Sequence, residues 1–380
     1  MNAPQHKHVA ELQTIRGIAA MIVVIGHAIS YYATPPWFTL VKRLVNTQAS
    51  VEIFFILSGF VLTASLSGKP FDRASACAFY VKRLFRIYPA LWAASTLALV
   101  YVLLLHFRIP VENSSPWFQA RFRPDRLTPL HIAASYAGFL AFLLPPVWTI
   151  FVELVGSLIM PVVAWLAMRK RRVFLSLTVL TAAASVILGG RLYYHLDLYV
   201  FDFFLGAAIA LPAPRLGAAL RALGAWRYAL AAGAAALLIG LRAFLPVTTF
   251  GPWMQLAEAL LAAGLLLLIV RGQAEMPLLK TKSMLWLGDI SYSLYLLHFP
   301  VMCILAKLFT FTPLAAIDPM ALGLTLAAAT TVVALPMSSW VYFKVELPGI
   351  ALGARALALL GFSRPPAVSS LAKSAPAEAI

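Results

Sequence analysis

Arg16 and His27 stand eleven residues apart in a segment that is otherwise mostly apolar. On an α-helix, eleven steps of 100° return to within about 20° of the same face and rise roughly 16 Å. One helix face would therefore carry a guanidinium near one end and an imidazole further along. Imidazole accepts a proton from a hydroxyl near neutral pH, which makes His27 a candidate general base. A snorkelling arginine and a histidine hydrogen-bonded to a neighbouring helix would explain the same pattern.

A second cluster, Lys82-Arg83-Leu84-Phe85-Arg86, places two guanidinium groups on one helix face, because Arg83 and Arg86 are three residues apart. Planar donors of this kind bind phosphate oxygens bidentately. The cluster directly precedes an apolar stretch at 87–106, so we expect it at the cytoplasmic mouth of a membrane span. A simple anchor on lipid headgroups is the alternative interpretation.

Two further segments carry polar groups into apolar surroundings. Trp148 and Glu153 lie in the sequence WTIFVE, where we expect the carboxylate just inside the outer surface. Glu153 could orient a histidine, bind an acceptor hydroxyl or form an ion pair with an arginine. Tyr292, Tyr295 and His298 recur every three residues and form one polar stripe on an apolar helix. Such a stripe forms either the wall of a substrate path or packing contacts between helices.

The composition decides which class of protein must position these groups. Of the 380 residues, 62% are hydrophobic and 12% charged, whereas soluble domains are about 45–50% apolar and about 25% charged. This excludes a water-soluble globule, and the two cysteines exclude a disulfide framework. A net charge of +16 would suggest nucleic acid for a soluble protein. In a membrane protein it indicates basic cytoplasmic loops instead, so we expect a lipid bilayer and no nucleic acid as partner.

The apolar runs predict an all-α polytopic membrane protein with about ten transmembrane helices. A segment at 131–144 is too short to span and ends at Pro145-Pro146, so we expect it to be re-entrant or interfacial. Excluding it places the basic run 169–172 in the cytoplasm, together with both termini. No nucleotide-binding loop, hydrolase motif or metal-spaced cluster is present, so we expect no metal site. The predicted spans are 12–32, 51–67, 87–106, 147–168, 173–189, 228–245, 254–270, 285–306 and 320–343, with a weaker tenth at 198–211.

These segments together resemble the membrane acyltransferase 3 family. The matching motifs occur in the family's order and spread over most of the chain. They are RGIAAMIVVIGH at 16–27, VEIFFILSGFVLT at 51–63, RLFR at 83–86 followed by IYP, WTIFVE at 148–153, ISYSLYLLHFP at 290–300 and VYFKVELP at 341–348.

The resemblance implies a stand-alone acyltransferase transmembrane domain at 1–348, without an appended extracytoplasmic hydrolase-like domain, followed by a short flexible cytoplasmic tail at 349–380. Such an enzyme moves an acyl group, most often acetyl, from cytoplasmic acyl-CoA to a hydroxyl of an envelope saccharide, such as exopolysaccharide or lipopolysaccharide O-antigen. It acts in the inner membrane of a bacterium. Acyl-CoA is a co-substrate, and no tightly bound cofactor is expected.

The roles that follow from the resemblance and the chemistry are expectations for named residues. We expect His27 to act as base or acyl carrier and Glu153 to support it, while Arg16, Arg83 and Arg86 bind the CoA donor. The acceptor would be contacted by Trp148, Tyr292, Tyr295 and His298. The loop 107–130, with Trp117 and Phe118, is the expected acceptor surface or an interfacial aromatic belt. A secondary transporter that uses the same arginine, histidine and glutamate as binding site and proton relay is the alternative function.

Overall fold

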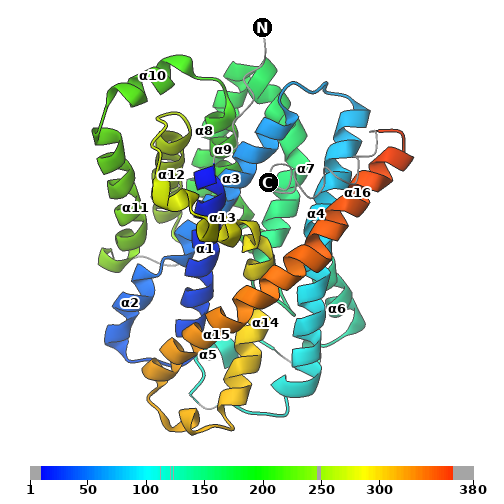
Figure 1. Cartoon of the computed structure of the whole chain (residues 1–380), viewed down its shortest axis with the longest axis vertical. Coiled ribbons are helices and arrows are strands. Elements are labelled where there is room, and N and C mark those ends of the chain that lie inside the picture. Colours follow the sequence, from blue (N-terminus) through cyan, green and yellow to red (C-terminus); the bar gives the residue numbers. More distant parts are fainter. Residues whose placement is uncertain (1–9, 112, 120, 123, 246–249, 363–380) are drawn as a thin grey trace.

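The computed structural model describes residues 10–111, 113–119, 121–122, 124–245 and 250–362, and over these residues the chain is built of helices without a strand (Figure 1). Within this part, nine helical stretches are long and apolar enough to cross a membrane. The all-α polytopic class predicted from composition is therefore confirmed. The nine stretches are built on α1 (Ala10–Ile29), α3 (Thr47–Leu66), α4 (Arg73–Tyr101), α7 (Val147–Arg169), α8 (Arg171–Leu188), α11 (Trp226–Phe244), α12 (Pro252–Val270), α14 (Ser291–Phe309) and α15 (Pro319–Val341).

The two ends of the bundle differ in chemistry. The start of α1 and the run Arg169-Lys170-Arg171-Arg172 lie at one end, which we call the basic end and which is uppermost in Figure 1. The opposite end, which we call the loop end, holds the end of α1, where His27 lies, and the described residues of the segment 107–128, with the short helix α5 (Pro116–Gln119). The positive-inside rule predicts that the basic end faces the cytoplasm.

The weak tenth span corresponds to α9 (Leu196–Ala210), which is followed after a break by α10 (Pro214–Ala222) at an angle of 86°. α9 packs along α3 at close range, because Gly59 lies against the backbone of Phe203 and Gly206 against that of Ile56. Small residues permit such close backbone contact between helices in a membrane. Most of α9 is buried inside the bundle, so its polar residues Asp197 and Asp202 are shielded from the surroundings.

The segment 131–144 does not cross as a helix. It overlaps α6 (Pro129–Tyr136), which has eight residues and is followed by irregular backbone up to Pro146. Tyrosine side chains satisfy part of this backbone: the Tyr88 hydroxyl donates to the Ala137 carbonyl at 3.0 Å, and the Ala141 N–H donates to the Tyr194 hydroxyl at 2.7 Å. Irregular backbone at membrane depth requires such internal partners. The segment therefore has the form expected of a re-entrant or interfacial element.

Two helices begin elsewhere than the hydropathy pattern predicts. α4 starts at Arg73, fourteen residues before the predicted span, because Asp72 caps it by accepting a hydrogen bond from the Ser75 N–H at 2.8 Å. This hydrogen bond lowers the pKa of Asp72, so the cap stays ionised. The predicted span 285–306 divides at Ile290 into the short helix α13 (Lys282–Asp289) and α14.

The chain ends in one long helical stretch. α15 continues through a π-helical turn, η7 (Tyr342–Glu346), into α16 (Leu347–Leu359), which packs against α4. Figure 1 shows this orange-to-red stretch running diagonally across the bundle. The predicted domain boundary at residue 348 lies within this stretch, and 349–359 of the predicted tail is helical. Residues 363–380 of that tail lie outside the described residues.

Candidate active site

Two histidines from different helices meet near the loop end. The Nδ1 atom of His27 on α1 lies 2.9 Å from the Nε2 atom of His298 on α14. Their rings are nearly coplanar, with centroids 5.2 Å apart and an interplanar angle of 10°. His298 is fully buried, whereas His27 is half-buried.

The backbone determines which nitrogens carry protons in this pair. The Nδ1 atom of His298 lies 3.2 Å from the carbonyl oxygen of Leu294, which can only accept a hydrogen bond. A neutral His298 therefore has its proton on Nδ1, and its Nε2 accepts from the Nδ1–H of His27. In this tautomer Nε2 of His27 carries a free lone pair, which is what a general base needs to accept a proton.

Aromatic rings surround the His27 imidazole. Trp117 from the loop-end segment is roughly parallel to His27, with centroids 6.2 Å apart, and Phe299 packs edge-on at 6.0 Å. The Arg121 guanidinium lies 3.7 Å above the Trp117 ring in a cation–π contact. Trp117 of the expected acceptor loop thus lies against His27.

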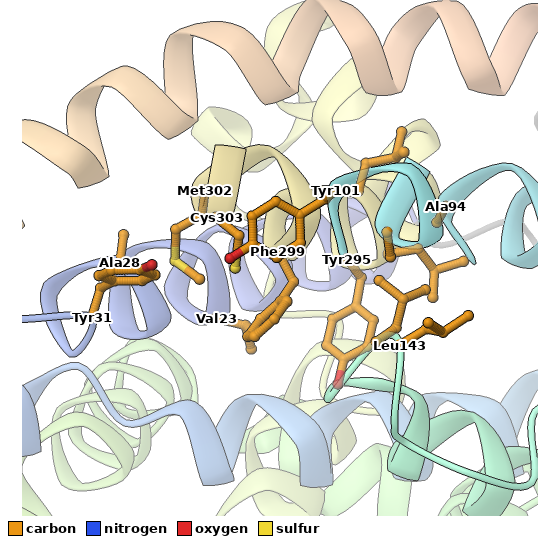
Figure 2. Close-up of a cluster of buried hydrophobic side chains, with 14 of the residues drawn as sticks. Val23, Ala28, Tyr31, Ala94, Tyr101, Leu143, Tyr295, Phe299, Met302 and Cys303 are labelled. Atoms are coloured by element: carbon orange, nitrogen blue, oxygen red, sulfur yellow. The ribbon is translucent and has the colours of Figure 1, made fainter. Parts of the chain in front are cut away.

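Tyr295 connects the histidine pair to α7. Its ring centroid is 5.9 Å from that of His298, and the Thr149 hydroxyl lies 2.9 Å from the Tyr295 hydroxyl. Figure 2 shows Tyr295 extending from α14 with its hydroxyl toward the start of α7, and Phe299 beside it on the same helix. Thr149 is four residues, or about one turn, from Glu153 on α7.

Glu153 forms an ion pair with Arg83, not a contact with a histidine. The carboxylate also accepts hydrogen bonds from the Ser58 hydroxyl at 2.9 and 3.0 Å, and the Nε of Arg83 donates to Ser157 at 3.1 Å. Of the three roles considered for Glu153, the structure shows the ion pair. Arg83 consequently lies inside the bundle, at the depth of Glu153, and not at the mouth of a span, because α4 begins at Arg73.

Arg86, one turn further along α4, forms the corresponding pair with Glu346. Glu346 is fully buried and also accepts a hydrogen bond from the Ser293 hydroxyl at 2.6 Å. The Arg86 guanidinium lies 5.2 Å from the centre of the Tyr292 ring, whose hydroxyl donates to the Ile87 carbonyl at 2.8 Å. The π-helical turn η7 ends at Glu346, and such turns are frequent at functional sites.

Arg16 is held at the junction of α13 and α14. Its Nε donates to the Ser291 hydroxyl at 2.8 Å and its Nη2 to the Gly288 carbonyl at 3.0 Å. α1 approaches α13 this closely because both contact residues are glycines: a Cβ on Gly17 would lie 2.7 Å from the Gly288 nitrogen. Arg16 also interacts electrostatically with Arg86 and Glu346.

With one exception, the predicted residues lie on the neighbouring helices α1, α4, α7 and α14 and contact one another in small groups, and we call this row of polar side chains the path. Trp148 packs against Tyr199 and Phe250, with centroids 5.3 and 6.3 Å apart, and points away from the path. Its neighbour Thr149 occupies the side of α7 that faces Tyr295. The path contains Arg16, Arg83, Arg86, Glu153, Glu346, Thr149, Tyr292, Tyr295, His298 and His27.

Sequence reasoning missed several members of this path. Glu346 was quoted only within the motif VYFKVELP, although a lone carboxylate in an apolar helix is a signal of function. Ser58, Ser157 and Ser293 gave no signal, because serine is common in membrane helices as an ordinary packing residue.

A second buried polar cluster lies apart from the path, between α3, α9, α11 and α12. Arg242 and Glu258 form an ion pair there at 2.5 Å, and the Asn46 side chain donates to Glu258 at 2.5 Å. Glu52 and Asp202 are also fully buried, and within the described residues neither oxygen of the Glu52 carboxylate has a hydrogen-bond partner.

The loop end also contains a cavity of about 280 Å³. Tyr31, Tyr101, Phe118 and Cys303 line it, and Figure 2 shows the hydroxyl of Tyr101 beside the sulfur of Cys303. Phe118 stacks on Phe299, which in turn packs against His27. The cavity therefore adjoins the aromatic layer around the histidine pair.

The fold and these contacts define a polytopic membrane protein whose helices enclose arginines, carboxylates, hydroxyls and a histidine pair. A family model described as an acyltransferase domain matches residues 9–339. The chain belongs to this family, acyltransferase 3, which confirms the resemblance of its motifs and makes it a membrane acyltransferase. Protein 2 in the picA locus of Rhizobium radiobacter is 27% identical over 190 residues, an alignment covering 46% of this chain and 90% of that protein. No solved structure matches the chain.

Proposed function

We propose that this acyltransferase transfers an acyl group, in the first instance acetyl, from cytoplasmic acyl-CoA to a hydroxyl of an envelope saccharide, such as exopolysaccharide or lipopolysaccharide O-antigen. The observation that carries the proposal is the His27–His298 pair, which leaves an unprotonated nitrogen at one end of a path of arginines. Together with the predicted orientation, this arrangement separates a cytoplasmic donor from an extracytoplasmic acceptor.

In the proposed reaction His27 acts as general base. Its Nε2 accepts the proton of the acceptor hydroxyl while the oxygen attacks the thioester carbonyl. The tetrahedral intermediate collapses with loss of the CoA thiolate, which takes the proton from His27 and departs as the free thiol. His298 holds the reactive tautomer by accepting from His27 Nδ1–H and disperses the positive charge that forms.

The arginines support the donor side of the proposal. The pantetheine arm of CoA, about 12 bonds long, extends roughly 14 Å, and Arg16 and His27 are separated by roughly 16 Å along α1. A diphosphate near Arg16, Arg83 and Arg86 would therefore place the thioester close to His27. Each guanidinium carries five N–H donors in a planar fork, an arrangement that suits phosphate oxygens as well as carboxylates.

The acceptor side is supported by the loop end. Tyr31, Gln119 and Ser114 line the 280 Å³ cavity and offer hydroxyl and amide groups beside aromatic faces. Aromatic rings with a few polar groups are typical of small-molecule sites. Trp117 covers His27 from the same segment.

The test is thiol release from acetyl-CoA by protein purified in detergent, with a hydroxyl-bearing oligosaccharide acceptor. We expect acceptor-dependent release by the wild type and a loss of at least 100-fold in His27→Ala. His131→Ala, which changes a histidine outside the path, is the matched control and should retain activity. Normal transfer by folded His27→Ala would refute the role of His27. Uptake of solute without thiol release would instead support the transporter.

A further inference from the structure

A second cavity, of about 680 Å³, opens at the basic end between the ends of α3, α4 and α7. Its lining includes two aromatic side chains, Phe71 and Trp165, and two cationic side chains, Lys69 and Arg169. None of these residues belongs to the polar path described above.

The cavity is in line with that path. Leu66, Ser75 and Trp165 line the cavity and lie eight residues from Ser58, Arg83 and Ser157 on α3, α4 and α7, respectively. Eight residues correspond to about 12 Å along each helix. The three helices that surround the Arg83–Glu153 ion pair therefore also surround the cavity, about 12 Å closer to the basic end.

The aromatic pair presents a flat surface at the entrance. The Phe71 and Trp165 rings are stacked, with centroids 5.4 Å apart and an interplanar angle of 29°. Phe71 is 57% exposed, so one face of the pair stays open. A nucleobase binds such a surface by stacking, without any need for specific hydrogen bonds.

The charged groups complement a phosphorylated ligand. Lys69 and Arg169 supply positive charge to the lining. Each is close in sequence to one of the two aromatic residues, since Lys69 precedes Phe71 and Arg169 follows Trp165. The lining also contains one carboxylate, Asp72, which caps α4 by accepting from the Ser75 N–H. The two cationic side chains outnumber it, so the lining keeps an excess of positive charge. Phosphates and an aromatic base are thus the combination that these residues favour.

We propose that this cavity binds the 3′-phosphorylated adenosine end of the acyl-CoA donor. The adenine stacks on the open face of the Phe71–Trp165 pair, and the 3′-phosphate binds Lys69 and Arg169. This inference rests on the proposed function and adds a nucleotide site to it. The adenosine diphosphate unit measures on the order of 10 Å at about 1.5 Å per bond, so it bridges the cavity and the arginines of the path.

The experiment compares two donors that differ only in the nucleotide: acetyl-CoA and S-acetyl-pantetheine. We expect Phe71→Ala to raise KM about tenfold for acetyl-CoA and to leave KM for S-acetyl-pantetheine unchanged. Lys69→Gln and Arg169→Gln should raise KM for acetyl-CoA and leave KM unchanged for acetyl-dephospho-CoA, which lacks the 3′-phosphate. The matched controls are Trp226→Ala, an aromatic that is 74% exposed and outside the cavity lining, and Arg172→Gln.

The outcomes separate this inference from the proposed function. If Phe71→Ala changes KM equally for both donors, or for neither, the nucleotide site is overturned. The proposed function is still upheld in that case, provided that the wild type transfers acetyl groups. An effect of the two cation variants without any effect of Phe71→Ala points to a lipid headgroup and also overturns the site. Should the wild type transfer no acetyl group from either donor, the function fails. In that case, CoA binding measured by calorimetry would still support the site if Phe71→Ala weakened it. If no CoA bound at all, both the nucleotide site and the proposed function would be overturned.

Discussion

Replacing His298 with leucine tests whether the tautomer of His27 is set by its neighbour. The substitution removes the acceptor 2.9 Å from His27 Nδ1 and puts an apolar side chain of similar reach in its place. His27 is then free to adopt the tautomer with its proton on Nε2, and a protonated Nε2 cannot act as the base. His298→Gln is the matched variant, because its side-chain oxygen can accept from His27 Nδ1–H.

The size of the effect follows from the contacts. A neutral hydrogen bond contributes about 0.5–1.5 kcal/mol, so loss of orientation alone costs roughly 2- to 13-fold in rate. Loss of the base itself costs about 10²- to 10⁴-fold. We therefore expect His298→Leu to lower kcat about tenfold, His298→Gln to lower it less, and His27→Ala to lower it at least 100-fold.

The decisive assay is a double-mutant cycle on steady-state acyl transfer. Residues that act as one unit are not additive, so His27→Ala/His298→Leu should be no slower than His27→Ala alone. If the two losses multiplied, His298 would act independently of His27, and the tautomer argument would be refuted. Thermal unfolding of each variant in detergent shows whether a rate loss reflects a loss of fold.

Three further outcomes are expected. Arg242→Met should destabilise the protein by about 3–5 kcal/mol in thermal unfolding, because it leaves Glu258 buried without its counter-charge. The double variant Arg242→Met/Glu258→Met should regain most of this stability. Equal losses in both variants would contradict the reasoning. Gly17→Val should reduce acyl transfer several-fold more than Gly17→Ala. The valine side chain is larger than that of alanine, so it pushes α1 further from Gly288 and displaces the neighbouring Arg16. Trp117→Ala should raise KM for the saccharide acceptor about tenfold and leave KM for acetyl-CoA unchanged; the reverse pattern would place the acceptor elsewhere.

The class of fold and most members of the site could be predicted because ionisable residues are conspicuous in an apolar chain. Arg16, His27 and His298 stand out for this reason, and the structure joins them in one path. Their partners could not be predicted, since pairing depends on how each helix is rotated and how deeply it sits. Glu153 and Arg83 illustrate this: one was expected near the outer surface and the other at the cytoplasmic mouth, yet they form an ion pair.

The depth error has a physical origin in α4. Hydropathy marks only 87–106 as apolar, so the charged stretch that begins at Arg73 reads as a loop. Two of its charges, Arg83 and Arg86, are instead paired with carboxylates on α7 and η7, which allows the helix to continue through the bundle. Compensation between segments so distant in sequence leaves no trace in a local pattern.

The pairing of Arg86 with Glu346 also bears on how the protein is made. The two residues are 260 positions apart, and the Ser291 partner of Arg16 is 275 positions from it. At synthesis rates of about 5–20 residues per second, Arg86 emerges from the ribosome roughly 13 to 52 s before its counter-charge. During that interval α4 lacks the carboxylate of Glu346, so water or lipid headgroups must solvate the Arg86 guanidinium until η7 arrives. Translation of the segment around Glu346 therefore completes the electrostatics of a helix that was made much earlier.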